Sequence, residues 1–383
     1  MLTVLLFSLL LSSSATETQD PTEYAGAIEK VEAMVTEAFA SDPLGSVTMG
    51  IVAGDHLVWS KSWGYSDVEN KVKATPDSVY RIGSISKQFT GLMLLQLEEQ
   101  GRVQFDDKVV QYFPPLRKVK DPFSAADSIT LLQLATMTSG LAREPDNLPL
   151  FLIGPVSEWE KVVISAMPKT SFHHNPSDNQ FLYSNIGYAI LGASLEGAVD
   201  TPFTEYVTDH IFEPLGMKHT AFEPNSQIEQ LIAKGYVRKT KLLSKGRQLD
   251  GRTPEEQHLG RGYKVPNGAM YTTIADLAKF LSFELGYGPE TVLSKSKMEN
   301  HFNRVRSESG EVISPYGIGF YVLPREDYIA YGHGGGVAGY TAAAYFDRES
   351  GFGVIGFRNV QGGPINIKEV CLRSLDILVE SGR

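Results

Sequence analysis

Residues 84–97 read SISKQFTGLMLLQL, and this stretch decides the fold. Its apolar side chains lie nearly all the way round a helix, which predicts a helix buried on every side. Gly101 follows three polar residues and is a predicted stop for this helix. Ser84 and Lys87 stand at its start, where packing alone gives no reason for a serine and a lysine.

The spacing of these two residues has a chemical interpretation. Residues three apart on a helix share a face, so the Ser84 hydroxyl and the Lys87 amine can meet. The helix dipole disfavours a second positive charge at this end, and burial lowers the pKa of a lysine. A neutral amine can take the proton of a neighbouring hydroxyl, so Ser84 is a candidate nucleophile and Lys87 its base.

Bulk composition excludes several classes of function. The chain has 383 residues, 42% of them hydrophobic, and a formal net charge of -10. Nucleic-acid binding needs a basic surface, and the sequence offers none. Cys371 is the only cysteine, so we expect neither an intrachain disulfide nor a cysteine metal site. The adjacent His173 and His174 cannot form a zinc site by themselves, so we expect them in an exposed loop and predict no metal or other cofactor.

Residues 1–16 read MLTVLLFSLLLSSSAT. An apolar run followed by small residues predicts a signal peptide over residues 1–15, and hence a secreted, periplasmic or extracellular protein. The run is too short for an ordinary membrane span, so we expect none in the mature chain. A retained anchor and a misassigned start codon are the alternatives.

The order of elements predicts an α+β fold. Strand patterns and flanking helices occur near both ends of the chain, whereas the middle is mainly helical. We expect an antiparallel sheet built from both chain ends, residues 21–115 and 265–383, with a mostly helical domain, 116–264, inserted. The expected strands are 47–53, 57–63, 316–322, 340–346 and 353–357. The expected helices besides the Ser84 helix are 24–39, 129–137, 187–199, 203–212 and 367–379.

A second candidate element is Tyr183-Ser184-Asn185, just before the 187–199 helix. The tyrosine and the amide could project into a cleft from a loop there. A neutral Tyr183 phenol would be a hydrogen-bond donor, whereas a nearby cation would lower its pKa and make it a candidate base or proton relay. Alternatively, Tyr183 packs between domains and Asn185 caps the helix.

A third element is His333-Gly334-Gly335-Gly336, expected as a loop before the 340–346 strand. Glycines let the backbone approach a ligand, and their N–H groups could stabilise an oxyanion. The pattern G-x-G-x-x-G begins at Gly334, but a strand rather than a helix follows, which excludes a dinucleotide site. The alternative for His333 is a hydrogen-bonded loop histidine.

Together the three elements resemble the Ser-x-x-Lys, Tyr-x-Asn and Lys/His-x-Gly motifs of serine β-lactamase-like and penicillin-binding proteins. The similar branch contains class C β-lactamases, D-Ala-D-Ala carboxypeptidases, D-aminopeptidases and family VIII esterases. The flanking stretches YRIGS (80–84), LATMTSGL (134–141) and GAMYTTIADL (268–277) add to the likeness, which runs from about residue 46 to the last strands.

The resemblance implies a β-lactamase/transpeptidase-like fold and a role for each residue. Ser84 would be acylated, and Lys87 and Tyr183 would share its proton and support deacylation. Asn185 would bind a substrate amide or orient Lys87. The N–H groups of Ser84 and Gly336 would form the oxyanion hole beside His333 and Gly335.

Two departures from the family pattern bear on the substrate. His333 stands where β-lactamases usually carry lysine, and a histidine is only partly charged near pH 7. Gly334 replaces the usual hydroxyl residue. We therefore expect a small ester, amide or peptide substrate, cleaved by an esterase or D-peptidase rather than by an efficient β-lactamase. A catalytically inactive binding or scaffold protein on the same fold is the alternative. Residues 142–172 and 239–262 are the expected cleft walls.

Overall fold

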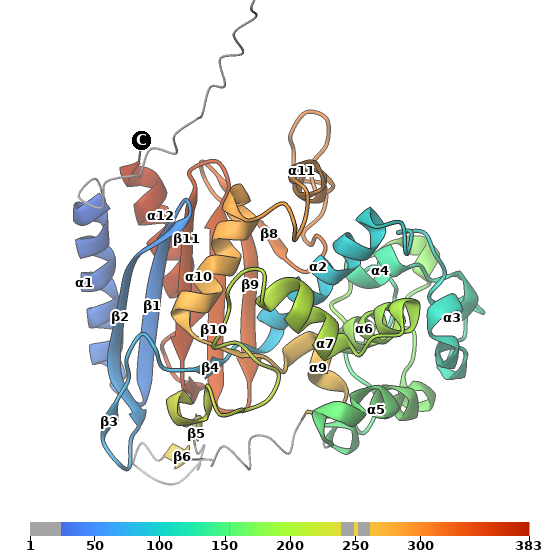
Figure 1. Ribbon diagram of the computed structural model, residues 1–383, viewed down its shortest axis with the longest axis horizontal. Coiled ribbons are helices and arrows are strands. Elements are labelled where there is room, and N and C mark those ends of the chain that lie inside the picture. The colour runs from blue at the N-terminus through green and yellow to red at the C-terminus, as the bar shows by residue number, and fades with distance from the viewer. Residues whose placement is uncertain (1–23, 153, 239–248, 252–260, 383) are drawn as a thin grey trace, which may run out of the picture.

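The computed structural model describes residues 24–152, 154–238, 249–251 and 261–382. Strands from both ends of this range form one seven-stranded antiparallel sheet (Figure 1). In spatial order they are β3 (Val72–Lys73), β2 (His56–Asp67), β1 (Ser46–Ala53), β11 (Phe352–Arg358), β10 (Tyr340–Asp347), β9 (Ile329–Val337) and β8 (Tyr321–Pro324).

Helices cover both faces of the sheet. The first and last helices, α1 (Ala25–Ser41) and α12 (Ile367–Ser381), lie side by side on one face, and α10 (Ile274–Ser282) packs on the other (Figure 1). Side chains of β10 alternate between the two apolar clusters, with Ala342 and Ala344 on the α10 side and Ala343 and Tyr345 on the α12 side. The central strands are therefore apolar on both faces.

The Ser84 helix, α2 (Ser86–Glu99), lies between the sheet and the other helices (Figure 1). Its residues 86–97 are all buried, as its apolar circumference predicted. Gly101 follows with a φ of 69°, which confirms it as the residue that ends the helix. The remaining helices are α3 (Val109–Tyr112), α4 (Leu131–Ala135), α5 (Trp159–Ala166), α6 (Asn185–Val199), α7 (Phe203–Val207) with a π-helical extension over Thr208–Phe212, α9 (Val265–Gly268) and α11 (Lys295–Asn303).

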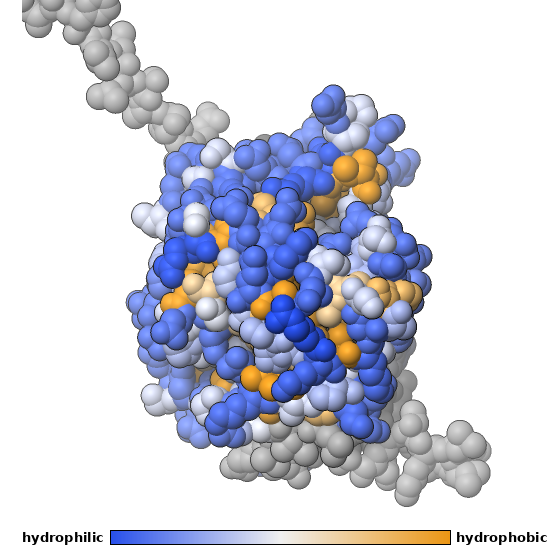
Figure 2. Space-filling view, turned by 90° about the vertical axis from the view of Figure 1, so that its right-hand side faces the viewer, coloured by the Kyte–Doolittle hydropathy of each residue, from blue (hydrophilic) through white to orange (hydrophobic). Residues whose placement is uncertain are grey.

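Short strands complete the structure. They are β4 (Tyr80–Arg81), which pairs with β7 (Tyr271–Thr272), and β12 (Val360–Gln361), which pairs with β5 (Tyr236–Arg238) beside β6 (Leu249–Gly251). The face in Figure 2, on the helical side of Figure 1, is mostly hydrophilic, with hydrophobic residues in small separate groups. No helix of the described residues is both long enough and apolar enough to cross a membrane.

Two expectations about the late strands are wrong. Only the end of the expected 316–322 strand is in a strand, β8, because Gly319 has a φ of 94° and breaks the run. The segment with His333 to Gly336 is not a loop but part of β9, paired along its length with β10. Glycine has low strand propensity, so the sequence IAYGHGGGV hid this strand.

The other expected elements are present with shifted ends, and the α+β fold class is confirmed. The predicted signal peptide, residues 1–15, lies outside the described residues. The boundaries of the inserted helical domain stay a prediction. Cys371 is free and fully buried against the sheet.

Candidate active site

Ser84 lies in a tight turn that joins β4 to α2. Gly83 opens this turn with a φ of 52°, a conformation that favours glycine, and a 3-10 turn over Gly83–Ile85 leads into the helix. The Ser84 side chain is half-buried and the Lys87 side chain is fully buried. Lys87 Nζ lies 2.9 Å from Ser84 Oγ and donates to the carbonyl of Asn267, also at 2.9 Å. The predicted pair is therefore in direct contact.

The environment of Lys87 favours its neutral form. Burial holds the pKa of Lys87 well below its usual value, and the positive charge of Lys264 lowers it further, whereas Glu144 opposes the shift. With one N–H directed to Asn267, a neutral amine has a lone pair that can accept the Ser84 hydroxyl proton. The arrangement can activate Ser84 as a nucleophile.

Tyr183 faces Lys87 from the start of α6. Its ring centroid lies 5.1 Å from Lys87 Nζ, and its hydroxyl lies 3.4 Å from His333 Nε2. Burial raises the pKa of Tyr183, and a hydrogen bond with Ser84 only partly offsets that effect. Of the two expected forms, the one with a lowered pKa is not found, because burial of the phenol outweighs the nearby positive charge of Arg143. Tyr183 is a neutral phenol that can donate a proton.

Asn185 does not cap α6. Ser184 does so, because its hydroxyl accepts a hydrogen bond from the Gly187 amide, and Asn185 is the first helical residue. Asn185 Nδ2 donates to Glu144 at 2.6 Å, and its Oδ1 has no hydrogen-bond partner among the described residues. The Asn185 carbonyl accepts from Asn267 Nδ2 at 3.0 Å. Asn185 is thus linked to Lys87 through Asn267, and its Oδ1 is a buried acceptor.

His333 closes the site from β9. Its side chain is buried, its Nδ1 lies 2.5 Å from the Gly334 carbonyl, and its Nε2 lies 3.1 Å from the Tyr316 hydroxyl. Burial lowers the pKa of His333 to about 3. With Nδ1 donating to the carbonyl, Nε2 can accept from the hydroxyls of Tyr316 and Tyr183. His333 is therefore neutral in this site.

The glycines of β9 let the strand lie directly on the Ser84 turn. A Cβ on Gly335 would lie 1.8 Å from the Ile82 carbonyl oxygen, and one on Gly83 would lie 2.8 Å from the Gly336 nitrogen. Only glycine fits at these two positions. The contact brings the Gly336 amide next to Ser84, as the predicted oxyanion hole requires.

The sequence did not reveal Asn267, Tyr316 or Glu144 as parts of the site. Asn267 directly precedes the 268–277 stretch, and Tyr316 lies in the segment mistaken for a strand. Glu144 interacts with Asn185, with the hydroxyl of Tyr263 and, at 3.4 Å, with Lys264. No local pattern marks these residues, because each acts across a long sequence separation.

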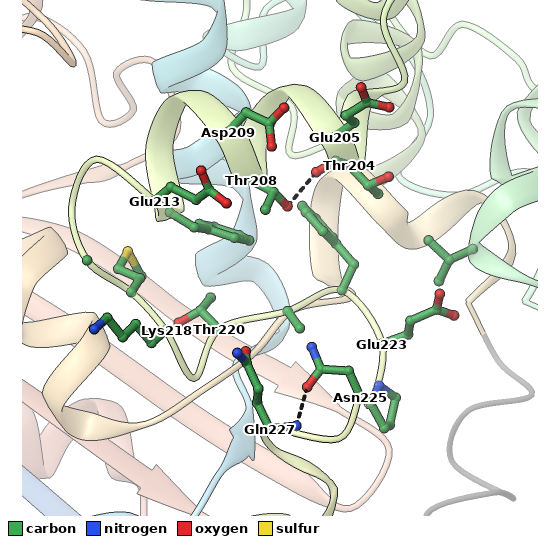
Figure 3. Close-up of a pocket in the computed structure, with 17 residues that line it drawn as sticks. Thr204, Glu205, Thr208, Asp209, Glu213, Lys218, Thr220, Glu223, Asn225 and Gln227 are labelled. Atoms are coloured by element: carbon green, nitrogen blue, oxygen red, sulfur yellow. Dashed lines mark hydrogen bonds between the residues drawn. The ribbon is translucent and has the colours of Figure 1, made fainter.

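A large hollow lies elsewhere in the helical part. It has a volume of about 910 Å³ and lies between α7, with its π-helical extension, and the 216–227 loop. Neither Ser84 nor Tyr183 is among the described residues that line it. Figure 3 shows the exposed carboxylates of Glu205, Asp209, Glu213 and Glu223 around it; we call it the acidic hollow. It offers no activated nucleophile. In the described part of the chain, no group of three or more His, Cys, Asp or Glu residues is placed to hold a metal ion. His173 is exposed and His174 is half-buried.

Comparison with known proteins gives consistent matches. The family model described as Beta-lactamase matches residues 31–367. Protein flp of Staphylococcus aureus (strain MW2) is 26% identical over 337 residues, which cover 87% of this chain and 63% of that protein. Beta-lactamase-like protein 2 of Dictyostelium discoideum is 31% identical over 287 residues, 73% of this chain and 49% of that protein. The chain thus spans less than two thirds of the length of either relative.

Solved structures match across most of the chain. The octameric penicillin-binding protein homologue from Pyrococcus abyssi has a TM-score of 0.74 and 26% identity, and the match covers 92% of this chain and 77% of that one. D-amino acid amidase from Ochrobactrum anthropi SV3 also has a TM-score of 0.74, with 20% identity over 93% of this chain and 99% of that one. The second likeness shows the fold alone. Together the matches confirm a β-lactamase/transpeptidase-like fold.

Proposed function

The chain belongs to the β-lactamase family, and on this premise we propose that it is a serine acyl hydrolase that forms an acyl-enzyme on Ser84. One observation carries the proposal. Lys87 Nζ lies 2.9 Å from Ser84 Oγ, and the amine is fully buried, with a pKa held well below its usual value. A hydroxyl beside a neutral amine is an activated nucleophile.

In the proposed acylation step, Ser84 Oγ attacks the carbonyl carbon while its proton moves to Lys87 Nζ. The carbonyl oxygen becomes an oxyanion, which the N–H groups of Ser84 and Gly336 stabilise. The intermediate collapses, the bond to the leaving group breaks, and the leaving group takes a proton from the Tyr183 phenol. Lys87 returns a proton to Tyr183, so both groups recover their resting forms.

Deacylation repeats this route with water as the nucleophile. Lys87 takes a proton from the attacking water, and the bond between the acyl carbon and Ser84 Oγ breaks. The proton returns to Ser84, and the acid product leaves. No step requires a group other than the substrate, water and these side chains.

His333 supports an ester or amide substrate over a penicillin. Its pKa of about 3 means that it carries no charge at neutral pH, so it cannot pair with a substrate carboxylate as a lysine would. The family relationship and the neutral histidine together support small esters, and amides of D-amino acids, as the substrates to test first.

Replacement of Ser84 by alanine tests the proposal. We expect kcat/KM for short p-nitrophenyl esters to fall roughly 10³- to 10⁶-fold, because the nucleophile is lost. Ser194→Ala is the control, since Ser194 is a fully buried serine whose hydroxyl only donates to the Ile190 carbonyl within α6. It should retain full activity.

A covalent probe separates an enzyme from an inactive protein on the same fold. A fluorophosphonate should add one adduct to the wild-type chain, found on the peptide that contains Ser84 by mass spectrometry. Absence of an adduct, or turnover retained by Ser84→Ala, would refute the assignment. Parallel assays with a chromogenic cephalosporin and a D-aminoacyl anilide rank the substrate classes.

A further inference from the structure

Met137 combines an unfavourable backbone conformation with complete burial. Six non-glycine residues of the described chain have a positive φ, and five of them are exposed: Lys71, Ser124, Asn147, Asn179 and Asp200. The sixth is Met137, with a φ of 60° and a fully buried side chain. This region of φ is unfavourable for a bulky side chain, and residues held in it cluster at functional sites. The conformation of Met137 therefore points to a role beyond packing.

Met137 binds the backbone on both sides of Tyr183. The Leu182 amide donates to the Met137 carbonyl at 2.7 Å, and the Ser184 amide donates to the Met137 sulfur, Sδ, at 3.1 Å. Met137 follows α4 closely in the chain, and α4 packs against α6. One residue thus ties both neighbours of the proposed proton donor to the helical layer.

The bond to sulfur is the weaker of the two contacts, and nothing described replaces it. Ser184 is buried, and Met137 Sδ is the only acceptor that the described residues offer to its amide. The Ser184 hydroxyl is already engaged, since it donates to the Ala142 carbonyl and accepts from the Gly187 amide. A thioether is a weak acceptor, but a buried amide without any partner is unfavourable. Loss of the sulfur would therefore loosen the segment that follows Tyr183.

Tyr183 must be placed accurately, because its phenol serves several partners. Its hydroxyl hydrogen-bonds with Ser84 and lies 3.4 Å from His333 Nε2. Its ring centroid lies 5.1 Å from Lys87 Nζ. A displacement of a reacting group by about 1 Å can lower a rate about 10²-fold. The backbone on either side of Tyr183, which Met137 holds, sets this placement.

We propose that Met137 is a positioning residue that holds Tyr183 where its phenol can protonate the leaving group. The inference rests on the proposed function, because it assigns a support to the proton donor of the Ser84 reaction. Met137 is fully buried and does not reach the substrate. It acts through the amides of Leu182 and Ser184.

Two esters with the same acyl group test the proposal. Ethyl butyrate releases ethoxide, a strong base that needs a proton as the bond breaks, whereas p-nitrophenyl butyrate releases a weak base that needs little help. Met137→Leu keeps the bulk but removes the acceptor. We expect its kcat/KM on ethyl butyrate to fall about 10- to 100-fold and that on p-nitrophenyl butyrate less than about threefold. The ratio of the two rates does not depend on the fraction of folded protein, so a loss of stability alone cannot change it.

A double substitution shows whether Met137 acts through Tyr183. Tyr183→Phe alone should slow ethyl butyrate far more than p-nitrophenyl butyrate, because the proton donor is lost. Adding Met137→Leu to this variant should then lower the ethyl butyrate rate less than about threefold further, since groups that act as a unit have non-additive effects.

Two more variants separate the acceptor from packing. Met137→His places a nitrogen, Nδ1, as many bonds from the backbone as Sδ, and histidine is enriched at positive φ. It should recover most of the ethyl butyrate rate. Met298→Leu is the control, because Met298 is a buried methionine of α11 whose sulfur accepts no hydrogen bond from the described residues. It should keep the wild-type ratio of the two rates.

Five outcomes would overturn the role of Met137. In Met137→Leu they are equal losses on both esters and no loss on either. In the other variants they are a double variant whose loss is the product of the single losses, a Met137→His variant no better than Met137→Leu, and a changed ratio in Met298→Leu. Fluorophosphonate labelling separates these from failure of the proposed function. A wild-type chain without label on Ser84 refutes the proposed function, whereas a labelled, active chain with an unchanged ratio in Met137→Leu refutes only the role of Met137.

Discussion

Two buried regions of this molecule contain groups with displaced pKa values, and only one of them can do chemistry. In the site, burial lowers the pKa of Lys87 and brings that of His333 to about 3. In α11 and in the turn that follows α10, burial brings the pKa of His301 to about 3 as well and raises that of Glu284 to about 8. The physical cause, desolvation, is the same in both regions.

The difference lies in what each group touches. Lys87 reaches the half-buried hydroxyl of Ser84, whereas Glu284 Oε2 and His301 Nδ1 have no hydrogen-bond partner among the described residues. A shifted pKa thus shows that a group is buried. Catalysis also requires a nucleophile in contact with that group and access for the substrate. Substitutions in each region can separate the effect of burial on stability from the effect on catalysis.

The largest effect is expected from Lys87→Met. Loss of the base should lower kcat/KM roughly 10²- to 10⁴-fold. At neutral pH an unfolded lysine is protonated and the buried Lys87 is not, so the native residue lowers stability and methionine should raise the melting temperature. Ester assays and thermal unfolding on the same sample measure both effects. A variant that is less stable but still active would contradict this account of Lys87.

The wild-type pH profile provides a check on the same group. Activity requires neutral Lys87, so kcat/KM should fall on the acid side only, as the amine gains a proton. Because burial lowers the pKa of Lys87, this loss should occur far below the usual lysine pKa of about 10.4. An acid limb at the usual lysine pKa would show that the amine is not desolvated in solution.

A smaller effect, on stability alone, is expected from Glu284→Gln. Between the usual glutamate pKa and about 8, folded Glu284 holds a proton that the unfolded chain has released, so wild-type stability falls as pH rises through this range. Glutamine removes that loss and should stabilise the protein by at least about 1 kcal/mol at pH 8, with little gain near pH 5. Urea unfolding at both pH values measures the difference, and ester hydrolysis should not change.

Glu299→Gln is the control for that measurement. Glu299 is mostly exposed and pairs with Arg348, the cation that also acts on Glu284. Its replacement should leave the slope of stability between pH 5 and pH 8 as in the wild type. The same change of slope in both variants would show that Glu284 is not the group that titrates.

The smallest effect is expected in the acidic hollow, where carboxylates are exposed and contact no nucleophile. Asp209→Asn and Glu213→Gln should each change kcat/KM less than twofold and stability by less than about 0.5 kcal/mol. Both line the hollow of Figure 3. A loss of ester hydrolysis comparable to that of Lys87→Met would show that this hollow, rather than the Ser84 turn, binds the substrate.

The sequence predicted the Ser84–Lys87 contact because it depends on one helical turn. A spacing of three residues and an apolar helix were enough, and the distance agrees. The sheet built from both chain ends could be predicted equally well, because β1, β10 and β11 are mostly apolar. Strand β9 could not be predicted, since glycine gives no strand signal and pairing with β10 and β8 holds it extended.

The supporting groups could not be predicted for a different reason. Asn267 lies 180 residues from Lys87 in the sequence, and its backbone carbonyl, which any residue could provide, makes the contact. The sequence left the charge state of Tyr183 open, because that state depends on burial in the surrounding site, which no short motif encodes. Long-range packing sets these electrostatic details.

The seam where β9 lies on the Ser84 turn has a consequence for the evolution of this chain. Gly83 and Gly335 carry no functional group, yet any side chain there would push the strand away from the nucleophile. In a deep mutational scan scored by activity, both positions would be as intolerant as the reactive residues themselves. Directed evolution toward new substrates must therefore leave this seam intact.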